Sequence, residues 1–451
     1  MPHPAYVIFL QRGQTAGLHM IGSFESMAKG LVLTGLYTPG GIGATKVSPM
    51  RVLIVGAGGV GTATALILAR REFVDRCVVA DYDIGRARVV ADRVGRAGFT
   101  AAAVDASDPH AVADLCRAHA VTHVVNAVDP RFVLAIFEGA FIAGADYLDT
   151  AMSLSSRHEQ APFEQCGVKL GDDQLAQSKA WEDAGRLAVV GMGVEPGLAD
   201  VFARYSADHL FSSIDEIGVR DASNLQVAGH DFAPTFSIWT TIEECLNPPV
   251  IWEADRGWFT TEPFSEPEVF TFPGGIGPVE CVNVEHEEVL LMPRWLDVGR
   301  VTFKFGLGDE FIEVLRTLNK LGLDRTDKVR VGDVRVSPRD VVAAVLPDPN
   351  TLGDKMSGVT CAGVWVTGTG KDGTGREVYV HHLADNEQSM AEWGSQAVVW
   401  QTALGPAIAL ELLAEGAWAG AGVLGPEAFD AVPFLDLLGA GYGQEWIVEE
   451  R

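Results

Sequence analysis

The chain has few basic residues and no closely spaced cysteines. Its 451 residues include 34 Lys and Arg against 60 Asp and Glu, a formal net charge of −26 at pH 7. A field of this sign repels nucleic acid and anionic lipid surfaces, so neither is expected as a partner. It would attract a cationic substrate, although an acidic balance is more often a solubility trait. None of the six cysteines stands in a C-x-x-C pair, which predicts reduced thiols in a cytoplasmic protein rather than a zinc or redox motif.

Membrane, secretion and metal signals are also lacking. No apolar run reaches the roughly 18 residues that span a bilayer. No basic segment precedes the first apolar stretch, so no signal peptide is predicted. His381 and His382 are adjacent and would face opposite ways on a strand, so we expect no metal site.

The length of the chain predicts two domains, because one hydrophobic core rarely serves so many residues. Residues 1–49 are expected to form an N-terminal extension, either loosely ordered or an arm that packs on a partner subunit. Residues 50–197 are assigned to a dinucleotide-binding domain and 198–390 to a substrate and dimerisation domain. Residues 391–451 are expected to form C-terminal helices that pack back on the first domain.

From Arg51 onward, apolar runs of strand length alternate with helical patterns. Continuous apolar strands that alternate with helices indicate an α/β domain with a doubly wound parallel sheet. The expected strands are Arg51–Gly56, Arg76–Asp81, Thr100–Val104, Val121–Ala127, Ala145–Asp149 and Leu187–Gly191, and the expected helices are Gly59–Arg71, Gly85–Ala97 and Asp108–His119.

After Pro196 the pattern changes to aromatic and polar strands. These predict a second, α+β domain built on a mixed or antiparallel sheet. Helices are expected at Ser337–Val345 and Asp309–Leu321, and a longer one at 391–413 that Gly416 could end. The expected strands are Glu216–Asp221, Val269–Phe272, Arg300–Phe305, Lys328–Val331 and Val359–Thr367.

The first strand leads into a glycine-rich turn, Gly56-Ala-Gly58-Gly59-Val60-Gly61, that opens a helix. Here the first glycine permits the turn, the second lets the backbone approach a diphosphate, and the third allows close packing of helix on strand. The helix N-terminus adds partial positive charge. Together with an acidic residue about 20 positions further on, this turn predicts a nicotinamide dinucleotide site.

That acidic residue is Asp81, at the end of the second strand. Its carboxylate can accept both ribose hydroxyls of NAD and opposes a 2′-phosphate, so NAD is favoured. Arg86 and Arg88 lie just downstream and could bind that phosphate, so NADP is not excluded. Asp105 is expected near the adenine and Asn126 near the nicotinamide, although either could instead be a turn or cap residue.

Beyond this motif the chain resembles the saccharopine dehydrogenase-like family. The resemblance implies an enzyme that oxidises or reduces a carbon–nitrogen bond of an amino acid, of the saccharopine reductase or lysine 6-dehydrogenase kind. A polyamine-precursor enzyme of the carboxynorspermidine dehydrogenase kind is the alternative, and a non-catalytic NAD-binding sensor is a third hypothesis. A homodimer is implied by the resemblance alone. The similar segments are 121–128, 145–149, 193–198, 236–239 and 277–280.

His286 is the first candidate for proton transfer, because an ordinary imidazole titrates near neutral pH. Strand alternation predicts that Glu280 and His286 share one face, with Asn283 and Glu287 on the other. Lys304, between two phenylalanines, could act as a base of lowered pKa, although such a lysine more often reaches toward water.

The candidate substrate-binding residues combine carboxylates, an aromatic ring and one cation. Carboxylates can hold a substrate ammonium, and an arginine can clamp a carboxylate with two parallel hydrogen bonds. For each of them a turn, a solvated helix face, a core position or an ordinary surface site is the competing interpretation. They are Glu195, Trp239, Glu243, Glu280, Asn283 and Arg294, with Asp231 as a further acid–base or ammonium-binding candidate.

Overall fold

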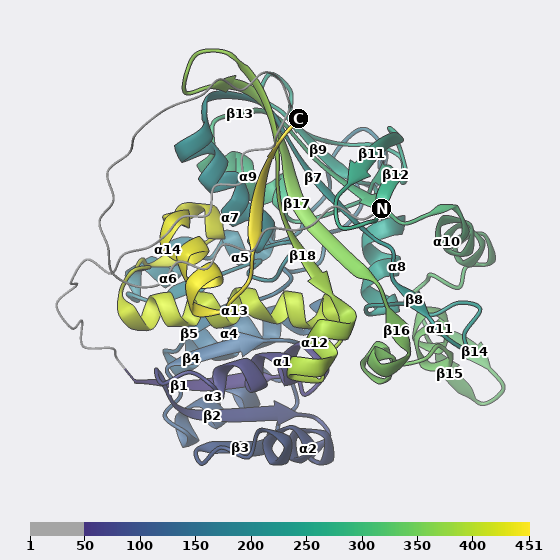
Figure 1. Ribbon diagram of the computed structural model, residues 1–451. Helices are drawn as coiled ribbons and strands as arrows, with labels where there is room; N and C mark the ends of the chain where they lie inside the picture. The colour runs from purple at the N-terminus through teal and green to yellow at the C-terminus, as the bar shows by residue number, and fades with distance from the viewer. Residues whose placement is uncertain (1–48) are drawn as a thin grey trace, which may run out of the picture. The chain divides into compact units, whose positions relative to one another are not determined.

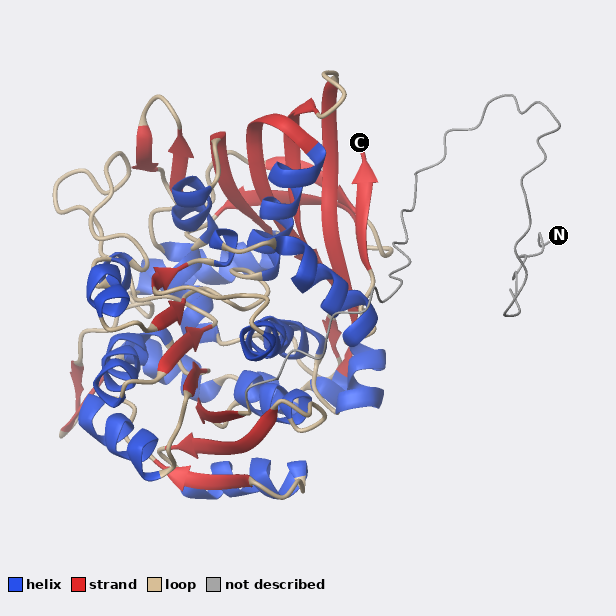
Figure 2. Ribbon diagram, turned by 90° about the vertical axis from the view of Figure 1, so that its left-hand side faces the viewer, coloured by secondary structure: helices blue, strands red, loops and turns tan. Residues whose placement is uncertain are grey.

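The computed structural model describes residues 49–451. The predicted extension over residues 1–49 therefore lies outside the described residues, except for its last position. Two large sheets organise the described chain, with helices packed around and between them (Figure 1, Figure 2).

The first sheet has seven strands in the order β19-β6-β5-β4-β1-β2-β3, and all its neighbouring pairs are parallel. The order reverses between β1 and β4, which is where parallel sheets of this kind bind ligands. The doubly wound fold predicted from the sequence is confirmed. Its strands are β1 (Met50–Val55), β2 (Val74–Asp81), β3 (Phe99–Ala103), β4 (His123–Asn126), β5 (Asp146–Asp149), β6 (Leu187–Val189) and β19 (Gly422–Leu424).

Helices cover both faces of this sheet. One group packs α1 against α2 and against α13 (Ala397–Glu415), and another packs α3 against α4. The remaining elements of this region are α1 (Gly59–Leu68), α2 (Ile84–Val94), α3 (Pro109–Ala118), η1 (Pro130–Phe132), α4 (Val133–Ala143), α5 (Asp172–Leu175) and α6 (Ser178–Asp183).

The second sheet has nine strands and is mixed, which confirms the predicted α+β domain. Its main order is β10-β9-β13-β7-β17-β18-β20, with the hairpin β11–β12 joined to β13. Only the β13–β7 pair is parallel. The strands are β7 (Phe211–Ser223), β9 (Val250–Glu253), β10 (Gly257–Thr260), β11 (Glu268–Phe272), β12 (Gly277–Asn283), β13 (Val298–Gly306), β17 (Val359–Gly370), β18 (Gly375–Asp385) and β20 (Trp446–Glu450).

Short strands and helices complete the second region. The strand expected at Lys328–Val331 lies in a separate two-stranded hairpin and not in the large sheet. These elements are α7 (Leu198–Tyr205), η2 (Ser206–Leu210), β8 (Gln226–Val227), α8 (Ile238–Leu246), α9 (Glu288–Trp295), α10 (Asp309–Leu321), β14 (Val329–Val331), β15 (Val334–Val336), α11 (Pro338–Val345), η3 (Pro349–Thr351), η4 (Gly353–Lys355) and β16 (Met356–Ser357).

The C-terminal segment joins both sheets, through β19 in the first and β20 in the second. The single helix expected at 391–413 is two helices, α12 (Asn386–Trp393) and α13. Gly394 ends α12 in the left-handed conformation, and the Gln396 side chain caps α13. Helix α13 ends at Gly416, as predicted. It is followed by η5 (Pro426–Ala428), α14 (Ala431–Asp436) and η6 (Leu437–Gly441).

Helix α13 is long and apolar enough to cross a membrane by length and composition, contrary to the expectation from the sequence. However, 89% of its apolar window is buried inside the protein. It lies between α14 and the first sheet (Figure 1) and packs on both α1 and α14. Its apolarity is therefore accounted for by the protein core.

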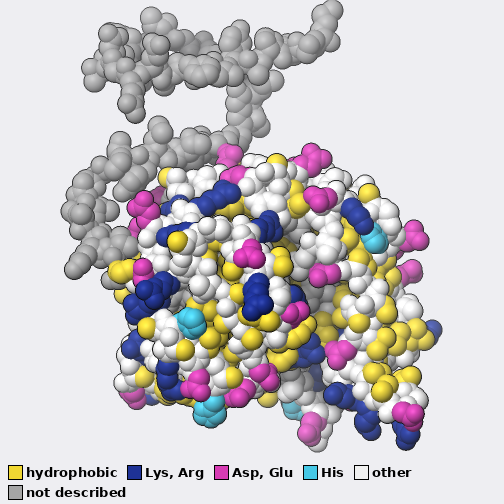
Figure 3. Space-filling model, turned by 90° about the horizontal axis from the view of Figure 1, so that it is seen from below, with side chains coloured by type: hydrophobic (Ala, Val, Ile, Leu, Met, Phe, Trp, Pro, Cys, Tyr) yellow, Lys and Arg dark blue, Asp and Glu magenta, His cyan; other side chains and the backbone are white. Residues whose placement is uncertain are grey.

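On the face seen from below, basic and acidic side chains are interspersed (Figure 3). All six cysteines are free, and five of them are buried.

Candidate active site

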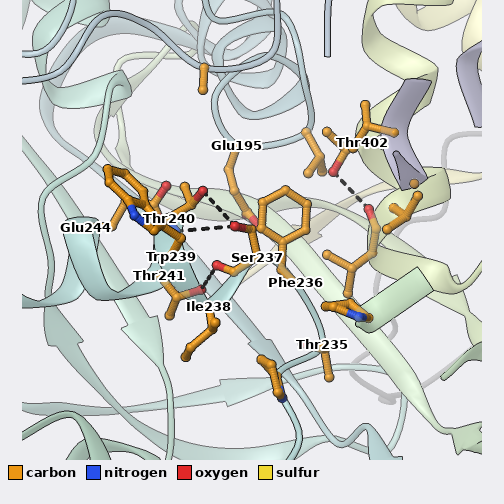
Figure 4. A pocket seen from close by; sticks show the side chains of 18 of the residues that line it. Glu195, Thr235, Phe236, Ser237, Ile238, Trp239, Thr240, Thr241, Glu244 and Thr402 are labelled. Carbon is orange, nitrogen blue, oxygen red and sulfur yellow. Dashed lines mark hydrogen bonds between the residues drawn. The ribbon is translucent and has the colours of Figure 1, made fainter. Parts of the chain in front are cut away.

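A cavity of about 710 Å³ opens at the carboxyl ends of the parallel strands. Its wall includes Gly59 and Val60 of the glycine turn, and the residues that directly follow β4 and β5. The opposite wall comes from the second region, mainly the segment 233–241 and the aromatic side chains of β13. Figure 4 shows Glu195, Trp239 and Glu244 among the side chains around it. This is the place where a dinucleotide and a substrate can meet in such a fold.

The glycine turn has the shape that a diphosphate needs. Gly56 has φ +108°, and a Cβ on it would lie 2.5 Å from the carbonyl oxygen of Ala127. A Cβ on Gly61 would lie 1.9 Å from the Gly56 oxygen, so only glycine permits this approach of helix and strand. Gly58 begins α1 without a side-chain cap, which leaves backbone N–H groups available to an anion. The residues present therefore fit a dinucleotide.

Asp81 lies beside the turn, where the sequence predicted it. Its carboxylate accepts hydrogen bonds from the backbone N–H of Ala57 at 2.9 Å and of Asp83 at 3.0 Å. A second cavity of about 200 Å³ adjoins the same turn and is lined by Arg86 and Arg93. One carboxylate and two guanidinium groups therefore lie near the part of the turn where the ribose of a dinucleotide would be expected.

The other predicted dinucleotide residues lie outside both cavities. Asn126 ends β4, donates to the Tyr147 hydroxyl and accepts from Val128 N–H, so it shapes the loop that lines the main cavity. Asp105 is exposed in a turn and accepts two hydrogen bonds from Ser107. Those bonds lower the pKa of its carboxyl.

The main cavity is lined by carboxyl groups and by no basic side chain other than histidine. Within residues 49–451, no Lys or Arg reaches its wall. Aromatic rings form much of the remaining surface, among them Phe303, Phe305 and Trp239. Carboxylates and aromatic faces both attract cations. The acidic lining residues are Asp129, Glu195, Asp221, Glu244, Glu287 and Asp348.

Glu195 and Asp221 form a buried, hydrogen-bonded carboxyl pair. Burial and the neighbouring acid raise the pKa of Glu195 well above its usual value. Burial also raises the pKa of Asp221, to about 6. As two carboxylates, Glu195 Oε2 and Asp221 Oδ1 would have no hydrogen-bond partner among the described residues. A proton on one of them would allow it to donate to the other, because two neighbouring buried carboxylates cannot both be ionised cheaply.

His286 lines the cavity and is held from two sides. Its ring stacks on Phe303 with centroids 3.9 Å apart and planes within 5°. Its Nδ1 donates to Glu288 Oε2 at 2.6 Å, with Glu287 Oε2 at 3.4 Å. Burial lowers the pKa of His286, but the carboxylates of Glu288, Glu287 and Glu244 outweigh burial and raise it to about 10. These neighbours therefore favour the protonated form of His286.

The ligand atoms of His286, Glu287 and Glu288 lie within 4.8 Å of one another, close enough for a metal ion. His286 Nδ1 is hydrogen-bonded to Glu288 Oε2, whereas Glu287 Oε2 and Glu288 Oε1 are buried without a hydrogen-bond partner among the described residues. The sequence-based expectation of no metal site stays a prediction.

The prediction that side chains alternate between two faces of a strand up to His286 is wrong for residues 284–287, which form a loop. Strand β12 ends at Asn283, and residues 284–287 turn into α9, so His286 and Glu287 both reach the cavity. Glu280 remains on the exposed part of the strand, and Asn283 is buried against Ser265. Neither lines the cavity.

Four further candidates also lie away from the cavity. Lys304 points to the opposite face of β13 from Phe303 and Phe305, and pairs with Glu268 at 2.7 Å. Asp231 is exposed in the loop before α8. The remaining two are Glu243, ion-paired with Arg339, and Arg294, which donates to the Leu290 carbonyl and lies over Trp258.

Glu195 and Trp239 do line the cavity, as predicted. Sequence reasoning missed Asp221, Glu244 and Glu287. Asp221 ends a segment that was predicted as a strand, and Glu244 follows the candidate Glu243 by one helical position. The position of Asp221 at the carboxyl end of a predicted strand was therefore the one feature of the sequence that could have identified a missed residue.

Two family models match the chain. The saccharopine dehydrogenase NADP binding domain matches residues 52–189, and the saccharopine dehydrogenase C-terminal domain matches residues 193–443. The chain belongs to the saccharopine dehydrogenase family. It is an NAD(P)-dependent oxidoreductase that acts on CH–NH groups, which sets aside the hypothesis of a non-catalytic sensor.

Curated relatives cover nearly the whole chain. Carboxynorspermidine synthase from Vibrio alginolyticus is 31% identical over 414 residues, which is 89% of this chain and 97% of the relative. Carboxyaminopropylagmatine dehydrogenase from Synechocystis is 30% identical over 390 residues, 86% of this chain and 95% of the relative. The solved apo saccharopine dehydrogenase (L-Glu forming) from Saccharomyces cerevisiae shares the fold, with a TM-score of 0.60, 14% identity, and coverage of 89% of this chain and 100% of that one.

Within this family the dinucleotide supplies or accepts the hydride. The glycine turn and the N-terminus of α1 would hold its diphosphate. His286 and the Glu195–Asp221 pair stand on the substrate side, where protons can be held or delivered. Aromatic side chains exclude water from the same wall.

Proposed function

We propose that this enzyme interconverts an imine and a secondary amine in a polyamine precursor that also carries a carboxyl group. The observation that carries the proposal is the cavity wall, on which six carboxyl-bearing residues and no Lys or Arg are found among residues 49–451. A chain with several ammonium groups complements such a wall, whereas a substrate with one ammonium and two carboxylates opposes it.

The curated relatives support the same substrate class. Their names denote polyamine or agmatine derivatives with a carboxyl group. They therefore favour the polyamine alternative over the amino-acid substrate of the saccharopine reductase or lysine 6-dehydrogenase kind, which the sequence had put first.

His286 is the group we propose for proton transfer. In the reductive direction, hydride adds to the carbon of the C=N bond and the π electrons move to nitrogen. Imine formation before that step releases water, whose oxygen needs a proton. The His286 imidazolium can donate that proton from Nε2, because Nδ1 is bonded to Glu288. Loss of this proton leaves the ring neutral, and departure of water leaves a cationic C=N bond, which addition of the hydride converts to the neutral secondary amine.

An absorbance assay of NAD(P)H oxidation tests the proposal. The full-length enzyme is offered aspartate semialdehyde with 1,3-diaminopropane or agmatine, and in parallel 2-aminoadipate semialdehyde with glutamate. We expect turnover with the first pairs and a kcat/KM at least about 100-fold lower with the second, on the basis of charge alone. Preference for the second pair would refute the polyamine assignment and restore the amino-acid one.

The same assay can decide whether the enzyme uses NAD or NADP. Asp81 favours NAD, because its charge opposes a 2′-phosphate, while Arg86 and Arg93 favour NADP. Titration of both reduced dinucleotides decides between them. A homodimer and a cytoplasmic location are also proposed, and light scattering at several protein concentrations tests the first.

A further inference from the structure

The proposed substrate contains a group that the cavity wall does not accommodate. A carboxylate placed among Glu195, Asp221, Glu244 and Glu287 would face acidic groups whose pKa values are already raised, and no Lys or Arg of the described wall would balance its charge. His286 is the one basic residue on the described wall, and its Nδ1 is bonded to Glu288. A substrate carboxylate therefore needs a cation that stands next to the wall.

Arg131 occupies such a position. It lies in η1, directly after Asp129 and Pro130, which both line the cavity. Its guanidinium lies over the ring of Trp239, another lining residue, with 4.3 Å between its carbon and the ring centroid. The segment belongs to the loop after β4, at the end of the sheet where the nicotinamide is expected.

The guanidinium is held in place but not fully used. Its Nε and Nη2 donate to the two oxygens of Asp129, at 2.9 and 3.1 Å, and its Nη1 donates to Asp340 at 3.1 Å. Arginine has five N–H groups. One N–H on each terminal nitrogen therefore has no partner within residues 49–451 and can donate a charge-assisted hydrogen bond to a carboxylate.

We infer that Arg131 binds the carboxylate of the substrate, with Asp129 and the Trp239 ring fixing the orientation of its guanidinium. This inference rests on the proposed function, because it assumes a substrate that carries a carboxyl group. The amines would then lie against the acidic wall of the cavity, and the carboxylate would extend past Asp129 and Pro130 to the cation beside the wall.

Other arginines fit this task less well. Arg339 also lies near Trp239, 4.6 Å from the ring centroid, but it is 7% exposed and donates to the Asp324 carbonyl and to the carboxylate of Glu243. Arg294, which the sequence suggested as the clamp, lies over Trp258 away from the cavity. Of these three arginines, Arg131 alone both adjoins residues of the cavity wall and has N–H groups without a partner among the described residues.

The test compares Arg131→Gln with Asp340→Asn in the full-length enzyme. Asp340→Asn breaks the ion pair that links η1 to α11 but keeps the Arg131 guanidinium. An effect seen only in Arg131→Gln is therefore due to the guanidinium and not to the loss of that link. Dissociation constants are measured by calorimetry, with the dinucleotide present, for carboxynorspermidine and for norspermidine, which lacks the carboxyl group. Turnover of carboxynorspermidine is measured alongside.

We expect Arg131→Gln to raise the Kd of carboxynorspermidine about 10- to 100-fold and that of norspermidine less than about 2-fold, as for the loss of a charge-assisted pair. Asp340→Asn removes the hydrogen bonds that Asp340 accepts from Arg131 and from the Trp239 indole, but it should not raise the Kd of carboxynorspermidine relative to that of norspermidine. Equal weakening of both ligands, no weakening, or the same effect from Asp340→Asn would overturn the inference. Absence of binding and turnover in the parent enzyme would instead refute the proposed function, and the inference with it.

Discussion

The two ends of the cavity are built from different parts of the chain. The dinucleotide end is made of backbone: three glycines, the N-terminus of α1 and one carboxylate at the end of β2. The substrate end is made of side chains, which come from the turn after β6, from β7, from α8 and from the loop after β12. The first can be recognised from one short segment, whereas the second exists only when distant segments come together.

This difference has a physical consequence. Backbone N–H groups bind a phosphate without changing their own charge, so the dinucleotide end is insensitive to pH. The substrate end gathers carboxyl groups that burial and mutual repulsion keep partly protonated. Substitutions at the two ends should therefore differ in kind as well as in size.

The largest effect is expected from His286→Gln. The glutamine amide can still donate to Glu288, but it cannot transfer a proton, so kcat should fall about 10²- to 10⁴-fold. The Kd of the reduced dinucleotide, measured by its fluorescence, should stay unchanged. His381→Gln is the matched control, since His381 is equally buried but lies in β18 away from the cavity. A His286→Gln enzyme with parental kcat would remove the histidine from the mechanism.

At the dinucleotide end, Gly61→Ala should weaken cofactor binding about 10- to 100-fold. The added Cβ would lie 1.9 Å from the Gly56 oxygen, so α1 must shift away from β1. Fluorescence titration gives the Kd, and a melting curve shows how far the fold is affected. Gly375→Ala, where nothing lies within 4 Å, is the control. Unchanged cofactor affinity in Gly61→Ala would show that the turn tolerates a side chain.

The same contrast explains what the sequence could predict. The turn Gly56–Gly61 and Asp81 are separated by one helix and one strand, so their spacing alone fixes their geometry. The doubly wound sheet followed from apolar strands that alternate with helices. At this end of the molecule, prediction and structure agree because the interactions are local.

The substrate end could be predicted only in part. Glu195 was found because it lies in a conspicuous turn, but Glu243 was preferred over Glu244 on α8 because sequence does not show which side of the helix faces the cavity. Lys304 was misplaced for a similar reason, since its strand presents Phe303 and Phe305 to the cavity. Asp221 and Glu195 pair across strands that no local pattern connects.

A smaller effect is expected from Glu244→Gln, and it should depend on pH. Burial, together with the charges of Glu287 and Glu288, raises the pKa of Glu244 to about 8. Its carboxyl is neutral below that pH and ionised above it, so KM for a polyamine substrate should fall as pH rises through about 8. The substitution should remove this step and raise KM about tenfold at high pH.

The neighbouring substitution Glu243→Gln is the control for that pH profile. Glu243 is ion-paired with Arg339 and does not line the cavity, so its loss should leave the pH dependence of KM unaltered. If Glu243→Gln removes the step and Glu244→Gln does not, the wrong face of α8 has been assigned to the substrate.

The smallest effect concerns stability behind the substrate end. Asp200 and Glu427 form a second buried carboxyl pair, and burial raises the pKa of Glu427 to about 7. A carboxyl with a raised pKa in the folded state contributes stability that is full below its unfolded pKa and is lost as pH rises through the folded one. The free energy of unfolding should thus decrease up to about pH 7, with Glu427 contributing at most about 1.4 kcal/mol per pH unit.

Urea unfolding at several pH values tests this prediction. Glu427→Gln should show a shallower slope of the free energy of unfolding against pH. Glu411→Gln, which removes a buried carboxyl group paired with Arg71, should lower the free energy of unfolding without making that slope shallower. An unchanged slope in Glu427→Gln would mean that this pair holds no proton.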